Sequence, residues 1–206
     1  RNQAKRHAAH GEPPSMAADH TSGGPTPSKL APGLYVTATP IGNLGDITLR
    51  AIDILKRCDG VACEDTRVTA KLLRAHGITT PTMSYHEHNA VRTGPGLLRR
   101  LADGQTIALV SDAGTPLISD PGFKLVREAA TRGIHISAVP GASAPLMALV
   151  LSGLPSDRFF YAGFLPQRKS ARRAELVQLA AIKATLVLLE SPRRLAASLN
   201  DMVEIL

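Results

Sequence analysis

Residues 107–122 read IALVSDAGTPLISDPG, a short apolar run that passes directly into a segment rich in Gly, Pro, Ser, Thr and Asp. The apolar run has the length of a strand, and its lack of polar positions predicts that both faces of the strand are buried. The segment after it has the residues of a loop that turns sharply or lets a ligand approach the backbone closely. A buried strand followed by such a loop is typical of a parallel sheet, where functional loops follow the strands.

The same unit recurs on both sides of this stretch, with amphipathic segments in between. Strict alternation of strands and helices predicts an α/β domain whose mainly parallel sheet has helices on both faces. The expected strands are Leu34–Ala38, Gly60–Cys63, Thr82–Tyr85, Ile107–Ser111 and Ile134–Val139. The expected helices are Leu49–Arg57, Arg67–Ala75, Leu97–Ala102 and Phe123–Thr131.

A second, shorter series follows Pro155, so we expect a first α/β domain at 33–154 and a second at 155–206. Its expected elements are strands Arg158–Gly163 and Thr185–Leu189, a helix at Ser170–Ala180, and another helix from near Arg193. The last helix reaches Leu206 without a capping residue, which leads us to expect an incomplete second domain. Residues 1–32 are rich in proline and lack aromatic residues, which predicts a disordered tail.

The composition excludes several classes of protein. The chain has 206 residues, of which 44% are hydrophobic, and its 2 cysteines are too few for a disulfide-stapled module. Cys58 and Cys63 match neither a redox motif nor a zinc knuckle, so we expect them to be small core residues. No stretch approaches the roughly 20 apolar residues of a membrane span, and the N-terminus has no apolar segment typical of a signal peptide. We therefore expect a cytoplasmic protein.

The net charge of +7 is unevenly distributed, because residues 158–194 alone carry +6. Such a local excess favours a surface that faces a polyanion, although a merely solvated face would have the same composition.

Three Gly- and Pro-rich loops, at 39–46, 111–122 and 140–144, follow expected strands and should meet at one edge of the sheet. None contains G-x-G-x-x-G or G-x-x-x-x-G-K-[ST], which disfavours a nicotinamide dehydrogenase and a nucleoside triphosphatase. Loops of this kind suit a ligand held mainly by backbone groups, such as a nucleoside with an uncharged or zwitterionic tail. Ordinary turn chemistry is the alternative for any single loop.

Six strings along residues 33–206 together resemble the ribosomal small-subunit RNA methyltransferase I family. They are Thr39-Pro-Ile-Gly-Asn-Leu, Glu64-Asp-Thr-Arg67, the stretch from Ser111 to Gly122, Pro140-Gly-Ala-Ser143, Gly163-Phe-Leu-Pro166 and Glu190-Ser-Pro-Arg193. This resemblance implies the tetrapyrrole methylase-like fold, also called class III of the S-adenosylmethionine-dependent methyltransferases. In that fold two α/β domains enclose a cofactor cleft.

The resemblance further implies transfer of a methyl group from S-adenosylmethionine to the ribose 2′-hydroxyl of a cytidine in the decoding centre of 16S rRNA. The substrate would be free RNA or the 30S subunit, and the enzyme would be a homodimer. It also implies which residues line the cofactor site: Thr39, Pro40, Ile41, Gly42, Ala113, Gly114, Thr115, Pro116, Ile118, Ser143 and Ala144, with Leu165 closing it from the second domain. Asp112 belongs to the same loop, either as a cofactor contact or as a turn residue.

A ribose hydroxyl is a poor nucleophile until its proton is accepted, so a carboxylate or histidine near the cleft would assist the reaction. Glu64 and Asp65 follow the second strand and are the candidate catalytic carboxylates, with Arg67 holding a phosphate or fixing one of them. The alternative is structural: Glu64 and Arg67 would form an ion pair at a helix start that Asp65 or Thr66 caps.

The string His86-Glu-His-Asn89 has two imidazoles at alternate positions, but no third ligand is identifiable and methyl transfer requires no metal, so no metal site is expected. The same loop could contact RNA. Tyr85 beside it suits the edge of the core better than a platform for a base.

The candidate RNA-binding residues are cations near two helix starts in the second domain. Cations there oppose the helix dipole, which favours an anionic partner. They are Arg168, Lys169, Arg172, Arg173, Arg193 and Arg194.

Two other functions remain open. A methyltransferase of the same fold could act on a tetrapyrrole or another small molecule, although such an acceptor would not need the basic segment. A non-enzymatic RNA-binding protein would keep the basic segment but would not need the cofactor.

Overall fold

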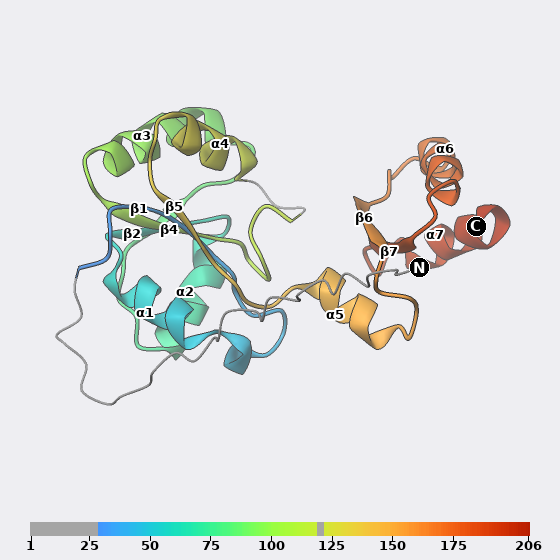
Figure 1. The fold of residues 1–206 in the computed structure, drawn as a ribbon, viewed down its shortest axis with the longest axis horizontal. Helices are drawn as coiled ribbons and strands as arrows, with labels where there is room; N and C mark the ends of the chain where they lie inside the picture. Colours follow the sequence, from blue (N-terminus) through green and yellow to red (C-terminus); the bar gives the residue numbers. More distant parts are fainter. Residues whose placement is uncertain (1–28, 119–121) are drawn as a thin grey trace, which may run out of the picture.

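The computed structural model describes residues 29–118 and 122–206, so the expected tail lies outside the described residues apart from its last four positions. A five-stranded sheet with its helices forms one unit, and a two-stranded sheet with two helices forms a second (Figure 1). Helix α5 (Ala144–Leu151) lies between the two units and contacts a strand of the second. No helix of the described residues is long and apolar enough to cross a membrane.

The first sheet is entirely parallel, with strand order β3-β2-β4-β1-β5. The predicted parallel α/β architecture is therefore confirmed. In the register, Leu34 lies opposite both Ile107 and Ile136, which places β1 between β4 and β5. The strands are β1 (Gly33–Thr37), β2 (Gly60–Cys63), β3 (Thr82–Ser84), β4 (Thr106–Val110) and β5 (Ile136–Val139).

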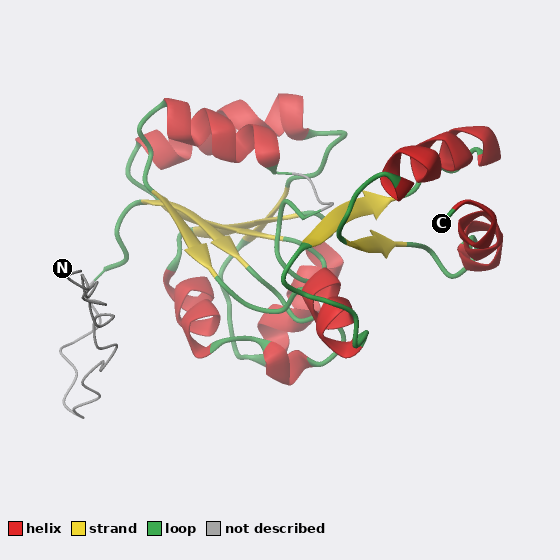
Figure 2. Cartoon of the chain, turned by 45° about the vertical axis from the view of Figure 1, so that its right-hand side comes forward, coloured by secondary structure: helices red, strands yellow, loops and turns green. Residues whose placement is uncertain are grey.

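Helices cover both faces of this sheet, as Figure 2 shows. They are α1 (Leu49–Arg57), α2 (Thr66–Ala75), α3 (Ala90–Ala102) and α4 (Phe123–Thr131). Strand β4 divides the core because successive side chains point to opposite faces. Ala108 and Val110 pack with α1 and α2, whereas Ile107 and Leu109 pack with α3 and α4. Cys58 and Cys63 are buried, free thiols in the first of these cores, as expected.

Two helices differ most from the sequence expectation, and each of them contains a proline. Helix α3 begins at Ala90 rather than Leu97 and continues through Pro95. Pro95 has no backbone N–H to donate to the carbonyl oxygen of Val91, four residues earlier. Because Val91 is 82% exposed, water can bond to that oxygen instead. The stretch Ala144–Leu151 was not assigned to a helix, yet Pro145 stands in the first turn of α5, where no intrahelical donor is needed.

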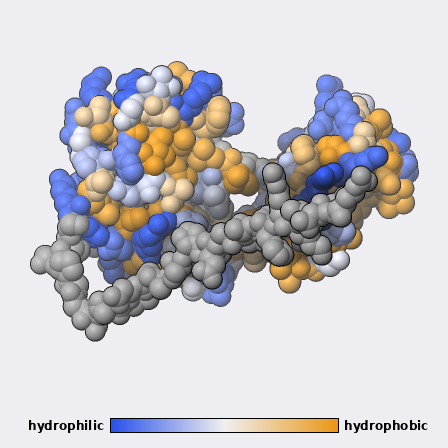
Figure 3. All heavy atoms as spheres, viewed as in Figure 1, coloured by the Kyte–Doolittle hydropathy of each residue, from blue (hydrophilic) through white to orange (hydrophobic). Residues whose placement is uncertain are grey.

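The second unit has β6 (Phe159–Phe164) and β7 (Thr185–Leu189) in parallel, with α6 (Lys169–Ala180) and α7 (Leu195–Ile205). Its core contains Leu165, Leu176 and Leu179. Apolar side chains also reach the surface: hydrophobic spheres gather at the C-terminal end of α7 in Figure 3, where Val203 is 86% exposed.

Helices α6 and α7 are joined by ion pairs that account for part of the basic segment. The side chain of Arg172 is only 6% exposed and lies 2.6 Å from the Asp201 carboxylate. Arg173 pairs with Asp201 at 3.0 Å and with Glu204 at 2.5 Å. Burial alone would raise the pKa of Asp201, but the hydrogen bonds from Arg172 and Arg173 lower it overall. Arg172 and Arg173 therefore have their anionic partners within the chain, on α7. This corrects the expectation, drawn from the helix dipole, that they bind RNA.

We expect Arg172→Ala to destabilise the protein by about 3 kcal/mol, because it leaves a buried carboxylate without its main partner. For a chain of this size the loss corresponds to roughly 6 to 12 °C in Tm, measured by thermal unfolding. Lys183→Ala, at an exposed position of the same unit, should leave Tm unchanged. An equal Tm for Arg172→Ala and the wild type would show that the ion pair adds nothing to stability.

Candidate functional site

The loops after β4, β1 and β5 meet at one edge of the sheet because these strands are neighbours. The first two loops pair through their backbones: Thr39 N donates to Gly114 O at 2.9 Å, and Gly114 N donates to Thr39 O at 3.1 Å. The predicted convergence of the Gly- and Pro-rich loops is thus confirmed.

Hydroxyl groups fix the loops further. The Thr39 hydroxyl donates to Ser111 O at 3.1 Å, and the Ser111 hydroxyl donates to Gly114 O at 3.1 Å. The third loop is attached where the Thr115 hydroxyl donates to Ala142 O at 3.1 Å. Hydrogen bonds within the protein therefore hold the three loops together.

A small pocket of about 260 Å³ lies between these loops and the second unit. Seven of the expected cofactor residues line it: Ile41, Ala113, Gly114, Thr115, Ile118, Ser143 and Ala144. Three further lining residues were missed by sequence reasoning, namely Pro145, Phe164 and Leu189. Phe164 and Leu189 end the two strands of the second unit, which is the signal that could have identified them.

Gly114 shapes this pocket. Its φ of +82° belongs to the left-handed region, and a Cβ there would lie 3.3 Å from Ile41 Cγ2 and 3.6 Å from Ala142 O. A side chain would therefore enter the space between the loops, so the pocket requires glycine both for its conformation and for its volume.

Four of the expected cofactor residues belong to the same loops but do not line the pocket. Thr39 is buried in the pairing with Gly114, and Pro116 is buried too. Pro40 and Gly42 flank Ile41 in the first loop, where Gly42 is exposed with a φ of +144°.

Leu165 does not close the pocket. It is 3% exposed and packs in the core of the second unit with Leu176 and Leu179. Its neighbour Phe164, which is 54% exposed, lines the pocket instead. The reason is the alternation of side chains along an extended chain, which turns successive residues to opposite sides.

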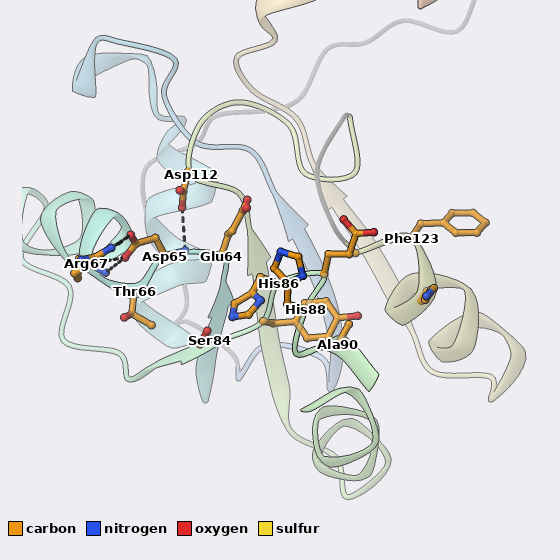
Figure 4. Close-up of a pocket in the computed structure, with 14 residues that line it drawn as sticks. Glu64, Asp65, Thr66, Arg67, Ser84, His86, His88, Ala90, Asp112 and Phe123 are labelled. Atoms are coloured by element: carbon orange, nitrogen blue, oxygen red, sulfur yellow. Dashed lines mark hydrogen bonds and ion pairs between the residues drawn. The ribbon is translucent and has the colours of Figure 1, made fainter. Parts of the chain in front are cut away.

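A larger, open pocket of about 890 Å³ lies on the other side of the loop that follows β4. Asp112 lines this pocket and not the small one, and its contact with a cofactor stays a prediction. The lining is mostly polar (Figure 4) and comprises Glu64, Asp65, Thr66, Arg67, Ser84, Tyr85, His86, Glu87, His88, Ala90, Asp112, Gly122, Phe123 and Lys124.

Asp65 caps α2, as the structural alternative predicted. Its Oδ1 accepts from Arg67 N at 2.8 Å, and its Oδ2 accepts from Arg67 Nη2 at 2.7 Å. The side-chain hydrogen bonds from Arg67 are the main cause that lowers the pKa of Asp65 from 3.8 to about 2. A carboxylate with this pKa is a weak proton acceptor near neutral pH, and Arg67 is committed to fixing it.

Glu64 is the carboxylate at this edge that is half-buried and not part of the cap. Asp112 Oδ1 accepts from Asp65 N at 3.1 Å, which ties the loop after β4 to the start of α2. Figure 4 shows this bond and places Glu64 beside it, facing the pocket. Glu64 is therefore the stronger of the two candidate catalytic carboxylates.

The turn from Ser84 to Asn89 is held by the Asn89 side chain, whose Oδ1 accepts from His86 N at 2.9 Å and whose Nδ2 donates to Ser84 O at 3.2 Å. This fixes His86 at the pocket. Nowhere in 29–118 and 122–206 do three or more His, Cys, Asp or Glu side chains gather as a metal site would need. Tyr85 is 2% exposed and belongs to the core.

The remaining expected RNA-binding residues divide into two groups. Arg194 pairs with Glu190 at 2.6 Å and donates to Leu165 O at 3.1 Å, so it stabilises the second unit. Arg168, Lys169 and Arg193 are exposed, and none of them forms an ion pair with a described residue.

We expect the Asp65 cap to stabilise the protein at pH values above about 3.8, and this contribution to be lost as the pH falls towards about 2. Thermal unfolding of Asp65→Ala should show a Tm a few degrees below that of the wild type at pH 6. The difference should shrink between pH 4 and pH 2. Asp157→Ala, at an exposed carboxylate, is the control with no such pH dependence. A Tm difference that is constant with pH would contradict a role for the ionised carboxylate.

Comparison with known proteins agrees with this architecture. A relative from Mesorhizobium japonicum named "Ribosomal RNA small subunit methyltransferase I" is 58% identical over 86% of this chain and 60% of its own length. One of the same name from Halalkalibacterium halodurans is 53% identical over 84% of this chain and 60% of its own. The chain thus spans about 60% of the length of these curated relatives.

Among solved structures, the cobalamin biosynthetic enzyme cobalt precorrin-4 methyltransferase has a similar fold, with a TM-score of 0.62. The match covers 84% of this chain and 74% of that one, at 16% sequence identity. The profile of the family described as Tetrapyrrole (Corrin/Porphyrin) Methylases matches residues 33–206. The chain therefore belongs to the tetrapyrrole methylase family.

Proposed function

We propose that this chain is part of an S-adenosylmethionine-dependent methyltransferase that methylates the ribose 2′-hydroxyl of a cytidine in the decoding centre of 16S rRNA. One observation carries the proposal: an apolar pocket and a polar pocket lie on opposite sides of the loop after β4, lined by Ala113 and Asp112 respectively. Such a pair of sites suits a methyl donor and a polar acceptor. Both relatives described above bear the name of a ribosomal RNA methyltransferase.

The residues of the small pocket fit S-adenosylmethionine, which supplies a methyl group activated by a sulfonium. Its lining is largely apolar and small, and Gly114 leaves open the space that a Cβ would fill. Loops that follow β1, β4 and β5 would hold the cofactor mainly through backbone groups. Phe164 and Leu189 would contact it from the second unit.

The larger pocket would hold the acceptor ribose. Glu64 would accept the proton of the 2′-hydroxyl, while Asp65 and Arg67 would keep the start of α2 in place. Holding a nucleophile in line with a methyl group can supply much of the acceleration of such a transfer.

Arg168, Lys169 and Arg193 would contact phosphates, because they are exposed and form no ion pair with a described residue. We further propose that the protein works as a homodimer in the cytoplasm, on free 16S rRNA or the 30S subunit. Exposed apolar side chains on α5 and α7, such as Val150 and Val203, support an interface with a second subunit.

Incubation of the protein with 30S subunits and S-adenosylmethionine labelled at its methyl group tests this function. We expect the label on the ribose of one cytidine, mapped by nuclease digestion and mass spectrometry. Glu64→Gln should lower kcat by about 100-fold, the usual effect of removing a general base, with little change in cofactor affinity. In a parallel incubation with a tetrapyrrole in place of 30S subunits, label transferred only to that small molecule would contradict the RNA substrate. Cofactor binding without any transfer would contradict the enzymatic function.

Gly114→Val should abolish binding of S-adenosylmethionine, measured by calorimetry, because its side chain enters the small pocket. Gly104→Val is the matched control, since Gly104 has a nearly equal φ of +81° but no atom within 4 Å of its Cβ position. Both variants have the same kind of backbone strain, and only the first fills the pocket. Equal cofactor affinity in the two variants would place the cofactor elsewhere.

A further inference from the structure

Phe123 is an exposed aromatic side chain in a polar pocket. It is the first residue of α4, lines the larger pocket, and is 63% exposed. In contrast, Tyr35 and Tyr85 of the same unit are 7% and 2% exposed. Figure 4 shows the Phe123 ring extending outward at the end of the pocket opposite Asp65 and Arg67. The core of the unit therefore does not explain why an aromatic ring stands at this position.

Arg127 stacks on this ring. The two residues are four apart on α4 and so share one face of the helix, and the Arg127 guanidinium carbon lies 5.4 Å from the ring centroid. Arg127 is exposed, and no carboxylate of the described residues pairs with it. The stacked pair thus offers a flat apolar surface with a positive charge directly beside it.

The backbone before the ring holds it in place. Gly122 precedes α4 with a φ of +135°, and a Cβ there would lie 3.1 Å from Leu109 Cδ2 and 3.3 Å from Leu117 Cδ1. The start of α4 therefore sits directly on the sheet, in a position that only glycine permits. Phe123 therefore projects outward from the point where α4 begins against the sheet.

We propose that Phe123 and Arg127 form a platform on which the RNA substrate stacks a base that flanks the methylated nucleotide. This inference rests on the proposed function, since it assigns an RNA contact to the same pocket. Unpaired bases are commonly held by aromatic rings and guanidinium planes, and every base has a face that can stack. Arg127 adds the positive charge that attracts the adjoining phosphate. Lys124, which also lines the pocket, adds a second positive charge nearby.

A comparison of two polyanions separates stacking from charge: a ten-residue oligocytidine RNA and inorganic polyphosphate, which has no bases. We expect Phe123→Leu to bind the RNA about tenfold more weakly than the wild type, the size of effect that loss of one stacked base produces. Its affinity for polyphosphate should be unchanged. The control Arg168→Ala with Lys169→Ala should weaken the binding of both polyanions, because it removes charge alone.

Phe123→Trp supplies a direct readout, because the chain has no other tryptophan. This variant should keep the RNA affinity of the wild type, and its fluorescence should be quenched by oligocytidine but not by polyphosphate.

Three outcomes are distinguishable. Weakened binding of RNA alone by Phe123→Leu, together with selective quenching, supports the platform. RNA affinity that is equal in Phe123→Leu and the wild type overturns it and indicates that the ring is an ordinary apolar contact. Failure of the wild type to bind either this RNA or 30S subunits would instead contradict the proposed function, and with it the platform.

Discussion

The backbone pairing between Thr39 and Gly114 determines the geometry of both pockets. It joins the loop after β1 to the loop after β4 through two hydrogen bonds of 2.9 and 3.1 Å, at the edge where parallel strands present their ends. Because the Thr39 hydroxyl also bonds to Ser111 O, the loop after β4 is held at its base and its middle. Ala113 and Asp112 then face different pockets from adjacent positions. A few short hydrogen bonds thus fix the separation between the two sites.

Much of this arrangement follows from local sequence. Apolar runs such as 107–110 are too short and too apolar to be surface helices, and the Gly- and Pro-rich segments after them are typical of loops. Since the loops follow parallel strands, their meeting point is a consequence of topology. The family resemblance therefore suggested Ile41, Gly114 and Ser143 as cofactor residues, and the expected fold placed them at the same edge of the sheet. It was harder to predict the side of a loop that each residue faces, because this depends on the alternation of single side chains. Asp112 and Leu165 are examples.

Charge was the least predictable property. The basic segment contains arginines that look alike in sequence, yet Arg172 is buried against Asp201 whereas Arg168 is exposed. The carboxylates that pair with α6 lie about 30 residues later, on α7, and no local pattern connects the two helices. A positive run therefore predicts where cations are concentrated, but tertiary pairing decides how many of them remain available to an anionic ligand.

The two pockets differ in the way they can achieve selectivity. None of the residues that line the small pocket is charged, so its shape would select the ligand. A side chain at position 114 would take up part of that space, beside Ile41 and Ala142. The larger pocket is open and lined by titratable side chains, so shape alone could not orient the RNA that we propose as its ligand. Phosphate contacts would attract any nucleic acid equally, since charge carries no information about bases. A stacked ring fixes the plane of one base and so restricts the rotation of its neighbour. In the proposed reaction this constraint would bring a single hydroxyl towards Glu64, and an exposed aromatic side chain at the rim is suited to impose it.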